Sequence, residues 1–365
     1  MRAALLEAQG QPMRMVEGIE IEEPRAGQVR VKISNCGVCH TDVSNVDGVF
    51  PSAVPVILGH EAAGVVDALG PNVDGLQPGD HVVLTACPPC GACRACVRGE
   101  FSLCVNGGGI MSHTFYDGTT GLSLDGAQVY RGVGVGAFGE YVVTPASGAV
   151  KLPSDVPLDV VCVIGCAVQT GVGAVLNTAR VEAGSTVLVT GLGGVGLSTV
   201  QGARIAGAAR IIASDPVEDR RRVAASFGAT DLIDPTAEDL VARATELSGG
   251  GVDYAFETAG LASLILEGIN ACRPGGTTVC IGAPAMNDAL TIPVPAILVA
   301  TEKKLVGSLL GSCNALHDIP RFVALWRAGL LDLEGLITAR RPLAEVNQAM
   351  DDLRAGRGIR TVLSI

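Results

Sequence analysis

The sequence predicts an α/β protein in which a doubly wound parallel sheet is inserted into a β-rich domain. From residue 168 onward, apolar strand-like runs alternate with helical stretches, a pattern typical of parallel βαβ units. Residues 1–155 instead carry short β-rich runs separated by glycine and proline turns, as in a barrel-like all-β domain. After residue 308 the chain becomes largely helical and closes with a strand over 360–365, so we expect this tail to return to the first domain.

The individual elements follow from apolar periodicity and from turn residues. In the first domain the clearest strand-like runs cover 29–33, 63–66 and 81–84. In the second domain we expect strands over 185–189, 210–215, 231–233, 253–257 and 277–282. The helices expected between and after these strands cover 197–206, 218–227, 237–247, 261–272, 317–328 and 343–354. Gly228 follows the second of these helices and suits a left-handed cap.

Composition and charge limit the classes of protein to which the chain can belong. Hydrophobic residues make up 48% of the 365 residues and charged residues only 17%, which indicates a folded globular chain. The net charge of −11 argues against nucleic acid or an anionic membrane as a partner. The first residues show no secretory apolar run, and Gln169 and Thr170 interrupt the apolar stretch over 160–176. We therefore expect a cytoplasmic protein whose twelve cysteines serve as thiolate ligands before disulfides.

A glycine-rich turn follows the strand over 185–189. Gly191 permits the tight turn, Gly193 lets the backbone approach a pyrophosphate, and Gly196 allows the next helix to pack closely on the strand. Asp215 ends the following strand 19 residues after Gly196, where a carboxylate can accept the ribose hydroxyls of NAD and repel the extra phosphate of NADP. The alternative is an ordinary βα turn without a ligand. The candidate dinucleotide contacts are Gly191, Gly193, Gly194, Val195, Gly196 and Asp215.

Four cysteines lie in one loop, namely Cys90, Cys93, Cys96 and Cys104. Four thiolates at this spacing can enclose one tetrahedral zinc in a structural site. An iron–sulfur cluster is an alternative, but its fourth cysteine usually comes sooner and precedes proline, whereas Val105 follows here. Unligated cysteines are the other alternative. Cys87 is a surplus thiol, which we expect to be buried rather than bound.

Cys39, His60 and Cys166 also carry metal-ligating side chains, but no local spacing links them. A lone histidine is usually a satisfied core or surface group, and a lone cysteine is usually a small buried hydrophobe. Their spacing along the sequence alone therefore does not show that these three residues form one site.

The motifs together resemble those of the zinc-dependent medium-chain alcohol dehydrogenases. They occur in that family's order and comprise Cys39-His40-Thr41-Asp42, Gly59-His60-Glu61, the four-cysteine loop and the glycine turn. The resemblance covers essentially the whole chain and includes the tail over 358–363. It implies a GroES-like catalytic domain with the structural zinc loop over 1–167, a Rossmann NAD-binding domain over 168–308, and a return to the catalytic domain over 309–365.

The resemblance also implies roles near a catalytic zinc. Cys39, His60 and Cys166 match the ligands of that metal, an open set that leaves one place for substrate. Glu61 matches a carboxylate near the zinc. Asp42 matches the partner that orients His60. Thr41 matches the hydroxyl that takes the alcohol proton.

Other matches concern the cofactor. His40 and Arg360 match positions that contact the pyrophosphate, Thr170 the residue beside the nicotinamide, and Arg220 the cation near the adenosine ribose. For Thr170 and Arg220, a core hydroxyl and a solvated helix charge are the alternatives.

This chain departs from the family at several positions. Many relatives carry a histidine at the solvent end of the proton relay, where this chain has Ser44 and Asn45. Ser44 can hold a water but is a poor base at neutral pH. Ala86 and Gly132 replace bulkier residues, which favours a roomier pocket for aromatic or branched alcohols. The long connection over 111–138 is similar to that of dimeric members, so we expect a homodimer.

The predicted function is hydride transfer between an alcohol, with an aromatic or bulky one favoured, and NAD, giving an aldehyde or ketone, with one catalytic and one structural zinc. The first alternative is a thiol-dependent formaldehyde dehydrogenase that acts on an S-hydroxymethyl adduct. A zinc ribbon that binds nucleic acid is a second, disfavoured by the acidic charge. A third is a zinc-binding relative without activity.

Overall fold

The computed structural model describes residues 1–107 and 109–365 and groups them into two compact units. Unit 1 comprises Met1–Ala167, Cys313–Trp326 and Ile337–Ile365, and unit 2 comprises Val168–Ser312 and Arg327–Leu336. Among the described residues no single helix is long and apolar enough to cross a membrane, although the bent pair Leu158–Gly165 and Ala167–Ala179 passes on length and composition.

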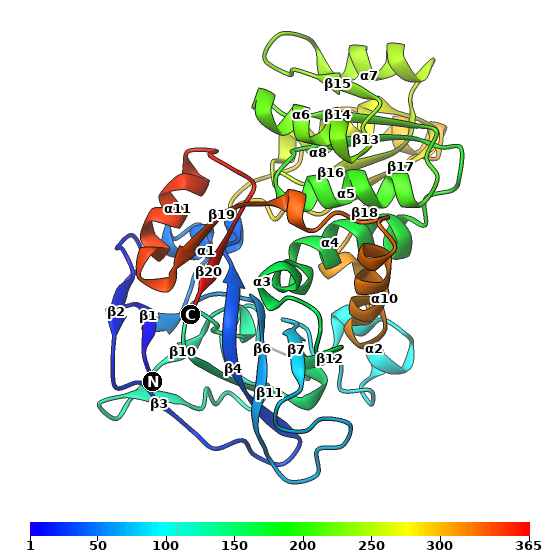
Figure 1. Ribbon diagram of the computed structural model, residues 1–365. Helices are drawn as coiled ribbons and strands as arrows, with labels where there is room; N and C mark the ends of the chain where they lie inside the picture. The colour runs from blue at the N-terminus through cyan, green and yellow to red at the C-terminus, as the bar shows by residue number, and fades with distance from the viewer. Residues whose placement is uncertain (108) are drawn as a thin grey trace. The chain divides into compact units, whose positions relative to one another are not determined.

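Unit 1 is rich in antiparallel strands (Figure 1). Its strands are β1 (Ala3–Leu6), β2 (Arg14–Val16), β3 (Glu20–Ile21), β4 (Gln28–Gly37), β5 (Val56–Ile57), β6 (Glu61–Leu69), β7 (His81–Leu84), β8 (Leu122–Leu124), β9 (Ala127–Gln128), β10 (Tyr130–Arg131), β11 (Tyr141–Pro145), β12 (Ala149–Leu152), β19 (Ile337–Pro342) and β20 (Arg360–Ser364). Its helices are α1 (His40–Val46), α2 (Arg94–Val97), α3 (Leu158–Val161), α10 (Ala315–Arg327) and α11 (Val346–Arg354), and its 3₁₀ turns are η1 (Phe101–Leu103), η2 (Gly132–Gly134), η3 (Ala146–Gly148), η4 (Cys162–Gly165) and η8 (Leu343–Glu345). The 3₁₀ turn η7 (Glu334–Leu336) follows α10 and belongs to unit 2.

The largest sheet of unit 1 has the order β12-β7-β6-β4-β20-β19, with β11 paired to β4. The last strand of the chain therefore pairs with β4 near the beginning, as Val362 opposite Gly37 shows. A second sheet has the order β10-β5-β1-β2, and a third has the order β3-β8-β9. The pairing of β4 with β6 sets Gly37 opposite Glu61, so the end of β4 lies beside the start of β6, next to Cys39 and His60 in the sequence.

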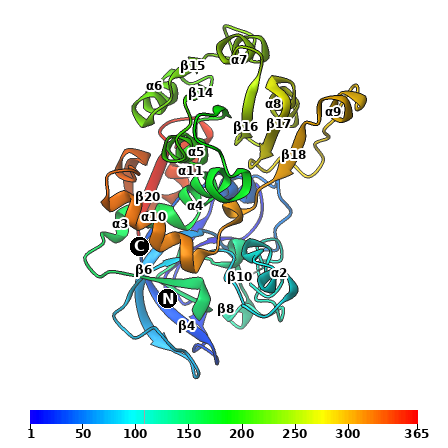
Figure 2. The ribbon, with the colours of Figure 1, turned by 90° about the vertical axis from the view of Figure 1, so that its right-hand side faces the viewer.

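Unit 2 contains a six-stranded parallel sheet with helices on both faces (Figure 2). Its strands are β13 (Thr186–Thr190), β14 (Arg210–Ser214), β15 (Asp231–Ile233), β16 (Val252–Glu257), β17 (Cys272–Cys280) and β18 (Lys304–Gly307). Its helical elements are α4 (Ala167–Gly173), the π-helix η5 (Ala174–Ala179), α5 (Gly194–Ile205), α6 (Glu218–Phe227), α7 (Leu240–Ser248), α8 (Ala262–Ala271), α9 (Ala296–Thr301) and the 3₁₀ turn η6 (Leu310–Ser312).

The strand order β15-β14-β13-β16-β17-β18 confirms the predicted doubly wound sheet. The chain runs outward from β13 to β15 and then returns to β16 on the other side of β13. Because such crossovers are right-handed, α5 and α6 cover one face and α7 and α8 the other. Buried side chains of the sheet, including Leu188, Ile212 and Ala255, pack with Leu240 and Ala244 of α7. The reversal at β13 is the place where doubly wound sheets bind ligands.

The structure differs from the sequence in several element limits. The helix expected over 237–247 begins at Leu240, because the Asp239 carboxylate caps it by accepting the Ala242 N–H at 2.7 Å. The helix expected to reach Cys272 stops at Ala271, because Cys272 is extended and opens β17. The connection over 111–138 contains β8, β9 and β10. Neither α9 nor β18 was expected.

The tail also differs from the continuous return expected over 309–365. Residues 309–312 and Arg327–Leu336 belong to unit 2. The second segment is tied to α5, because Gln201 exchanges two hydrogen bonds with the Asp332 backbone, at 2.7 and 2.9 Å. Leu333 and Leu336 are fully buried, which adds apolar stabilisation to these bonds.

Candidate functional site

Three residues that are distant in sequence meet in unit 1. Cys39 precedes α1, His60 lies between β5 and β6, and Cys166 follows η4. Their donor atoms all lie within 4.8 Å of one another, and each residue is less than 10% exposed. The structure therefore brings together the three side chains that sequence spacing could not connect. We call them the trio below.

Asp42 fixes the geometry of the trio from two sides. Its Oδ2 accepts the backbone N–H of Cys39 at 3.0 Å, and its Oδ1 accepts that of Gly59 at 3.1 Å. The same Oδ1 lies 3.1 Å from Nδ1 of His60. A proton on Nδ1 leaves Nε2 free as a metal ligand, which is the usual arrangement of ligating histidines.

The donor set of the trio fits zinc. Two soft sulfurs and one imidazole are ligands that zinc prefers, and three protein ligands leave an open fourth place. A hydrogen bond with Cys166, together with the charge of Arg360, holds the pKa of Cys39 well below its usual range. Burial opposes a charge on His60, but the Asp42 carboxylate raises the pKa of His60 well above its usual value. At Cys39 the site thus favours the thiolate that a metal requires, whereas the hydrogen bond with Cys39 and burial raise the pKa of Cys166 well above its usual value.

Glu61 and Arg360 form a buried ion pair beside the trio. Nη2 of Arg360 lies 3.0 Å from Oε1 of Glu61 and 3.8 Å from Sγ of Cys39. Oε1 also accepts the Ala167 N–H at 3.0 Å, whereas Oε2 has no hydrogen-bond partner among the described residues. Burial raises the pKa of Glu61 to about 7, although Arg360 opposes that shift. The structure does not group Glu61 with the trio, and it places the guanidinium of Arg360 inside unit 1.

The expected proton-relay residues lie on α1. Oγ1 of Thr41 is 3.8 Å from Sγ of Cys39. Ser44 is buried, and His40, the first residue of the helix, is exposed. Asn45 instead has a structural role, because its Nδ2 donates to the Thr41 carbonyl at 2.6 Å and its Oδ1 accepts the Ser52 hydroxyl.

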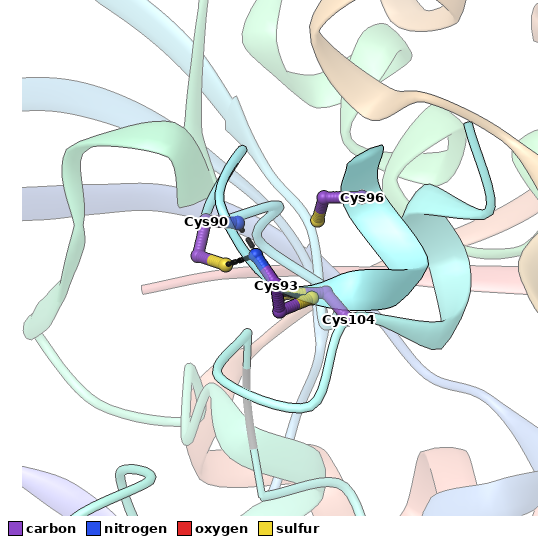
Figure 3. Close-up of side chains that lie close together, drawn as sticks. All are labelled: Cys90, Cys93, Cys96 and Cys104. Carbon is purple, nitrogen blue, oxygen red and sulfur yellow. Dashed lines mark hydrogen bonds between the residues drawn. The ribbon is translucent and has the colours of Figure 1, made fainter. Parts of the chain in front are cut away.

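The four-cysteine loop forms a second group (Figure 3). The sulfur atoms of Cys90, Cys93, Cys96 and Cys104 all lie within 4.8 Å of one another. Backbone N–H groups point at them: that of Cys93 donates to Cys90 Sγ at 3.3 Å, and that of Cys90 to Cys104 Sγ at 3.3 Å. Hydrogen bonds from the backbone of Cys96 and Val105 lower the pKa of Cys93 to about 6. Four sulfurs in this arrangement fit a closed zinc site.

We expect Cys93→Ser to remove one of two zinc ions per chain and to lower the melting temperature by roughly 10 °C, since a structural zinc contributes folding free energy. Cys87→Ser is the matched control. Cys87 lies outside the four-sulfur group, and burial raises the pKa of its thiol to about 12. Metal analysis and calorimetry check both variants. Unchanged zinc content in Cys93→Ser would contradict the assignment.

The glycine turn of unit 2 has the conformation that its sequence predicts. Gly191 has φ of +84°, and a Cβ on Gly196 would lie 1.8 Å from the Gly191 carbonyl oxygen. Gly193 caps α5, and a Cβ there would meet nothing within 4 Å. This leaves the start of α5, with Gly194 and Val195 in its first turn, open to a pyrophosphate.

Asp215 lies beside this turn. Its Oδ2 accepts the Leu192 N–H at 2.7 Å, and Oδ1 accepts the Val217 N–H at 2.8 Å. Nη1 of Arg220 is 3.9 Å from Oδ2, and Arg221 donates to the Asp215 carbonyl at 2.6 Å. Thr170 is buried on α4. The cradle fits a dinucleotide with free ribose hydroxyls.

Sequence reasoning missed Thr258, which directly follows β16. Its hydroxyl is placed to donate to the Gly191 carbonyl at 2.7 Å and to the Thr190 carbonyl at 3.0 Å. It therefore fixes the turn from the neighbouring strand. In the sequence, the only indication of this role is that a residue with a hydroxyl group follows the carboxyl end of a predicted strand.

The interpretation of Gly132 as a position that widens a pocket was wrong. A Cβ on Gly132 would lie 2.6 Å from Cδ2 of Leu58 and 2.8 Å from the Ile57 carbonyl oxygen. Close backbone packing accounts for the glycine. Ala86, the other position interpreted as widening the pocket, is buried, with 2% of its surface exposed.

Comparison with known proteins gives a consistent result. Residues 25–154 match the family model described as the alcohol dehydrogenase GroES-like domain. Residues 194–327 match the model described as zinc-binding dehydrogenase. The first match lies within the β-rich unit, and the second covers the part of the parallel sheet that follows β13 together with α10.

Individual relatives cover almost the whole chain. An S-(hydroxymethyl)glutathione dehydrogenase of Saccharomyces cerevisiae is 38% identical over 362 residues, covering 95% of this chain and 92% of its own. The crystal structure of an alcohol dehydrogenase zinc-binding domain protein from Burkholderia ambifaria superposes with a TM-score of 0.94 at 36% identity, covering 100% of this chain and 98% of that one. The benzyl alcohol dehydrogenase of Acinetobacter calcoaceticus gives a TM-score of 0.93 at 32% identity, covering 100% and 99%.

Proposed function

The chain belongs to the zinc-dependent medium-chain alcohol dehydrogenase family, and from this premise we propose that it oxidises a primary or secondary alcohol with NAD to an aldehyde or ketone, NADH and a proton, reversibly. The observation that carries the proposal is the trio of Cys39, His60 and Cys166, an open donor set whose histidine is oriented by Asp42. The glycine turn of unit 2 supplies the nucleotide site.

The protein's own residues hold the reactants and move the proton. When bound, zinc stabilises the negative charge that develops on the alcohol oxygen, and NAD accepts the hydride. Cys39, His60 and Cys166 would hold the metal. Thr41 Oγ1 accepts the alcohol proton while its own hydroxyl proton leaves to a water that Ser44 can hold, and from there to solvent. The guanidinium of Arg360 offsets the charge of the Cys39 thiolate, and its contact with the cofactor pyrophosphate stays a prediction.

We propose a bulky or aromatic alcohol as substrate. The small side chain of Ala86 and the similarity to a benzyl alcohol dehydrogenase support this. An S-hydroxymethyl thiol adduct such as the glutathione adduct named for the yeast relative is the second candidate. Glutathione carries carboxylates, which Lys or Arg side chains would bind. Residues 99–130 contain no Lys or Arg, and Arg131 is buried over the Phe115 ring, so this segment offers no exposed cation for the adduct. Gly134 packs against Ala86 and Gly109, so the segments that carry Gly109 and Gly134 lie next to Ala86.

The test is NADH formation by the purified protein with benzylic alcohols, aliphatic alcohols and the formaldehyde–glutathione adduct. We expect the highest kcat/KM with benzylic alcohols. Preference for the adduct would favour the second candidate, and no turnover with a zinc-loaded protein would contradict both.

We also propose a homodimer formed through unit 2. β18 is an edge strand, and exposed apolar residues surround it, including Leu305, Ile297 and Val299, the last 81% exposed. An exposed apolar edge is a template for pairing with another chain. The long connection over 111–138 is the second support. A reducing cytoplasm suits the cysteine ligands, and we place the protein there.

Leu305→Lys combined with Val299→Lys should convert the dimer into a monomer, because each cation must be desolvated in the interface. Light scattering after size-exclusion chromatography measures the mass. Lys304→Arg on the same strand is the control and should leave the dimer intact. A native mass for the double variant would show that the interface lies elsewhere.

A further inference from the structure

Two buried residues of unit 1 share an unusual backbone conformation. His113 has φ of +58° and Val133 has φ of +54°. This left-handed region is unfavourable for a β-branched side chain and persists only where surrounding contacts enforce it. The Val133 N–H donates to Nδ1 of His113 at 3.0 Å, so the two strained positions are joined directly.

His113 is itself fixed. Its N–H donates to the Gly109 carbonyl at 2.7 Å, and its carbonyl accepts the Arg131 N–H at 3.0 Å. Burial lowers the pKa of His113, which keeps the ring neutral and Nδ1 available as an acceptor. The ring is therefore a rigid acceptor for the loop that carries Val133.

That loop encloses the backbone immediately before His60. At its start, Gly132 packs on Leu58 so closely that a Cβ would lie 2.6 Å from Cδ2 of that residue. At its end, the Ala137 N–H donates to the Gly59 carbonyl at 2.8 Å and the Phe138 N–H to the Leu58 carbonyl at 2.8 Å. The ring of Phe138 leaves no room for a Cβ on Gly59.

We propose that His113 is a positioning residue for the zinc ligand His60. By holding Val133 in the left-handed conformation, it keeps the loop closed around Leu58 and Gly59. The Gly59 N–H then stays on Asp42, which orients the His60 ring. The inference rests on the proposed zinc site at the trio and adds a group that does not touch the metal.

Two substitutions of His113 separate this role from general stability. In His113→Asn the carboxamide oxygen can replace Nδ1 as acceptor, whereas in His113→Gln the polar group lies near the position of Nε2. Chelator competition on the full-length protein measures zinc affinity at each site, and the spectrum of the cobalt-substituted trio reports its geometry. Thermal melting first confirms that each variant is folded.

We expect His113→Gln to weaken zinc binding at the trio by at least about tenfold and to alter the cobalt spectrum, as substitutions behind metal ligands do. The four-cysteine site should change by less than about twofold, since the hydrogen bonds that its sulfurs make among the described residues involve only residues 90–106 of the cysteine loop itself. His113→Asn should bind zinc normally. Val133→Gly relieves the strain and should restore most of the lost affinity when combined with His113→Gln.

Equal affinities in the Gln and Asn variants would overturn the proposal, as would equal weakening of both metal sites or no rescue by Val133→Gly. Those results leave the proposed function intact, because wild-type zinc binding and turnover are measured separately. A wild-type protein that binds no zinc at the trio would instead overturn the proposed function together with this inference.

Discussion

Cys39→Ser is expected to lower kcat/KM for alcohol oxidation by at least about a thousandfold, equivalent to roughly 4 kcal/mol of transition-state stabilisation. The variant loses a thiolate ligand at the trio, so zinc content should fall from two ions to one per chain. NAD affinity should stay within about twofold, because the glycine turn and Asp215 belong to unit 2 and do not change. Steady-state kinetics, metal analysis and NADH fluorescence titration measure the three quantities.

His60→Ala should give the same loss through a second ligand, since it also leaves the Asp42 carboxylate without its imidazole partner. Cys87→Ser is the matched control, because Cys87 is a cysteine of the same unit outside both metal groups. It should retain two zinc ions and native turnover. Native turnover in Cys39→Ser or His60→Ala would show that the trio does not carry the reaction.

Asp215→Ser is expected to reduce the preference for NAD over NADP by about a hundredfold. The Asp215 carboxylate repels a 2′-phosphate, and its removal leaves the guanidinium of Arg220 beside the vacated position. Asp215 also holds the Leu192 and Val217 N–H groups, so the variant loses stability. The measurement is the ratio of kcat/KM with NAD to kcat/KM with NADP. The loss of stability affects both values equally and therefore cancels in this ratio.

The control for this prediction is Asp219→Ser, which removes an exposed carboxylate from α6 without touching the glycine turn. Its cofactor preference should equal that of the wild type. An unchanged preference in Asp215→Ser would mean that another group selects the cofactor.

Features set by local spacing were predictable from the sequence. The glycine turn needs only consecutive residues with special backbone requirements, and the four cysteines need only one short loop. Both adopt the expected local arrangement. The doubly wound sheet was also predictable, because alternation of strands and helices determines its topology with few alternatives.

Features set by long-range packing were not predictable in the same way. Cys39, His60 and Cys166 are joined by the pairing of β4 with β6 and by the position of η4, so only resemblance to a family linked them. The strained contact between His113 and Val133 depends on two loops meeting. The ion pair of Arg360 with Glu61 depends on the last strand reaching β4, so no local pattern in the sequence indicates it.

The most direct measurement follows the hydride itself. The zinc-loaded protein is incubated with NAD and benzyl alcohol deuterated at the carbinol carbon, and the NADH formed is analysed by mass spectrometry. The account predicts one deuterium in each NADH and a matching yield of benzaldehyde, both lost in Cys39→Ser. NADH without deuterium, or labelled NADH at an undiminished rate in Cys39→Ser, would contradict it.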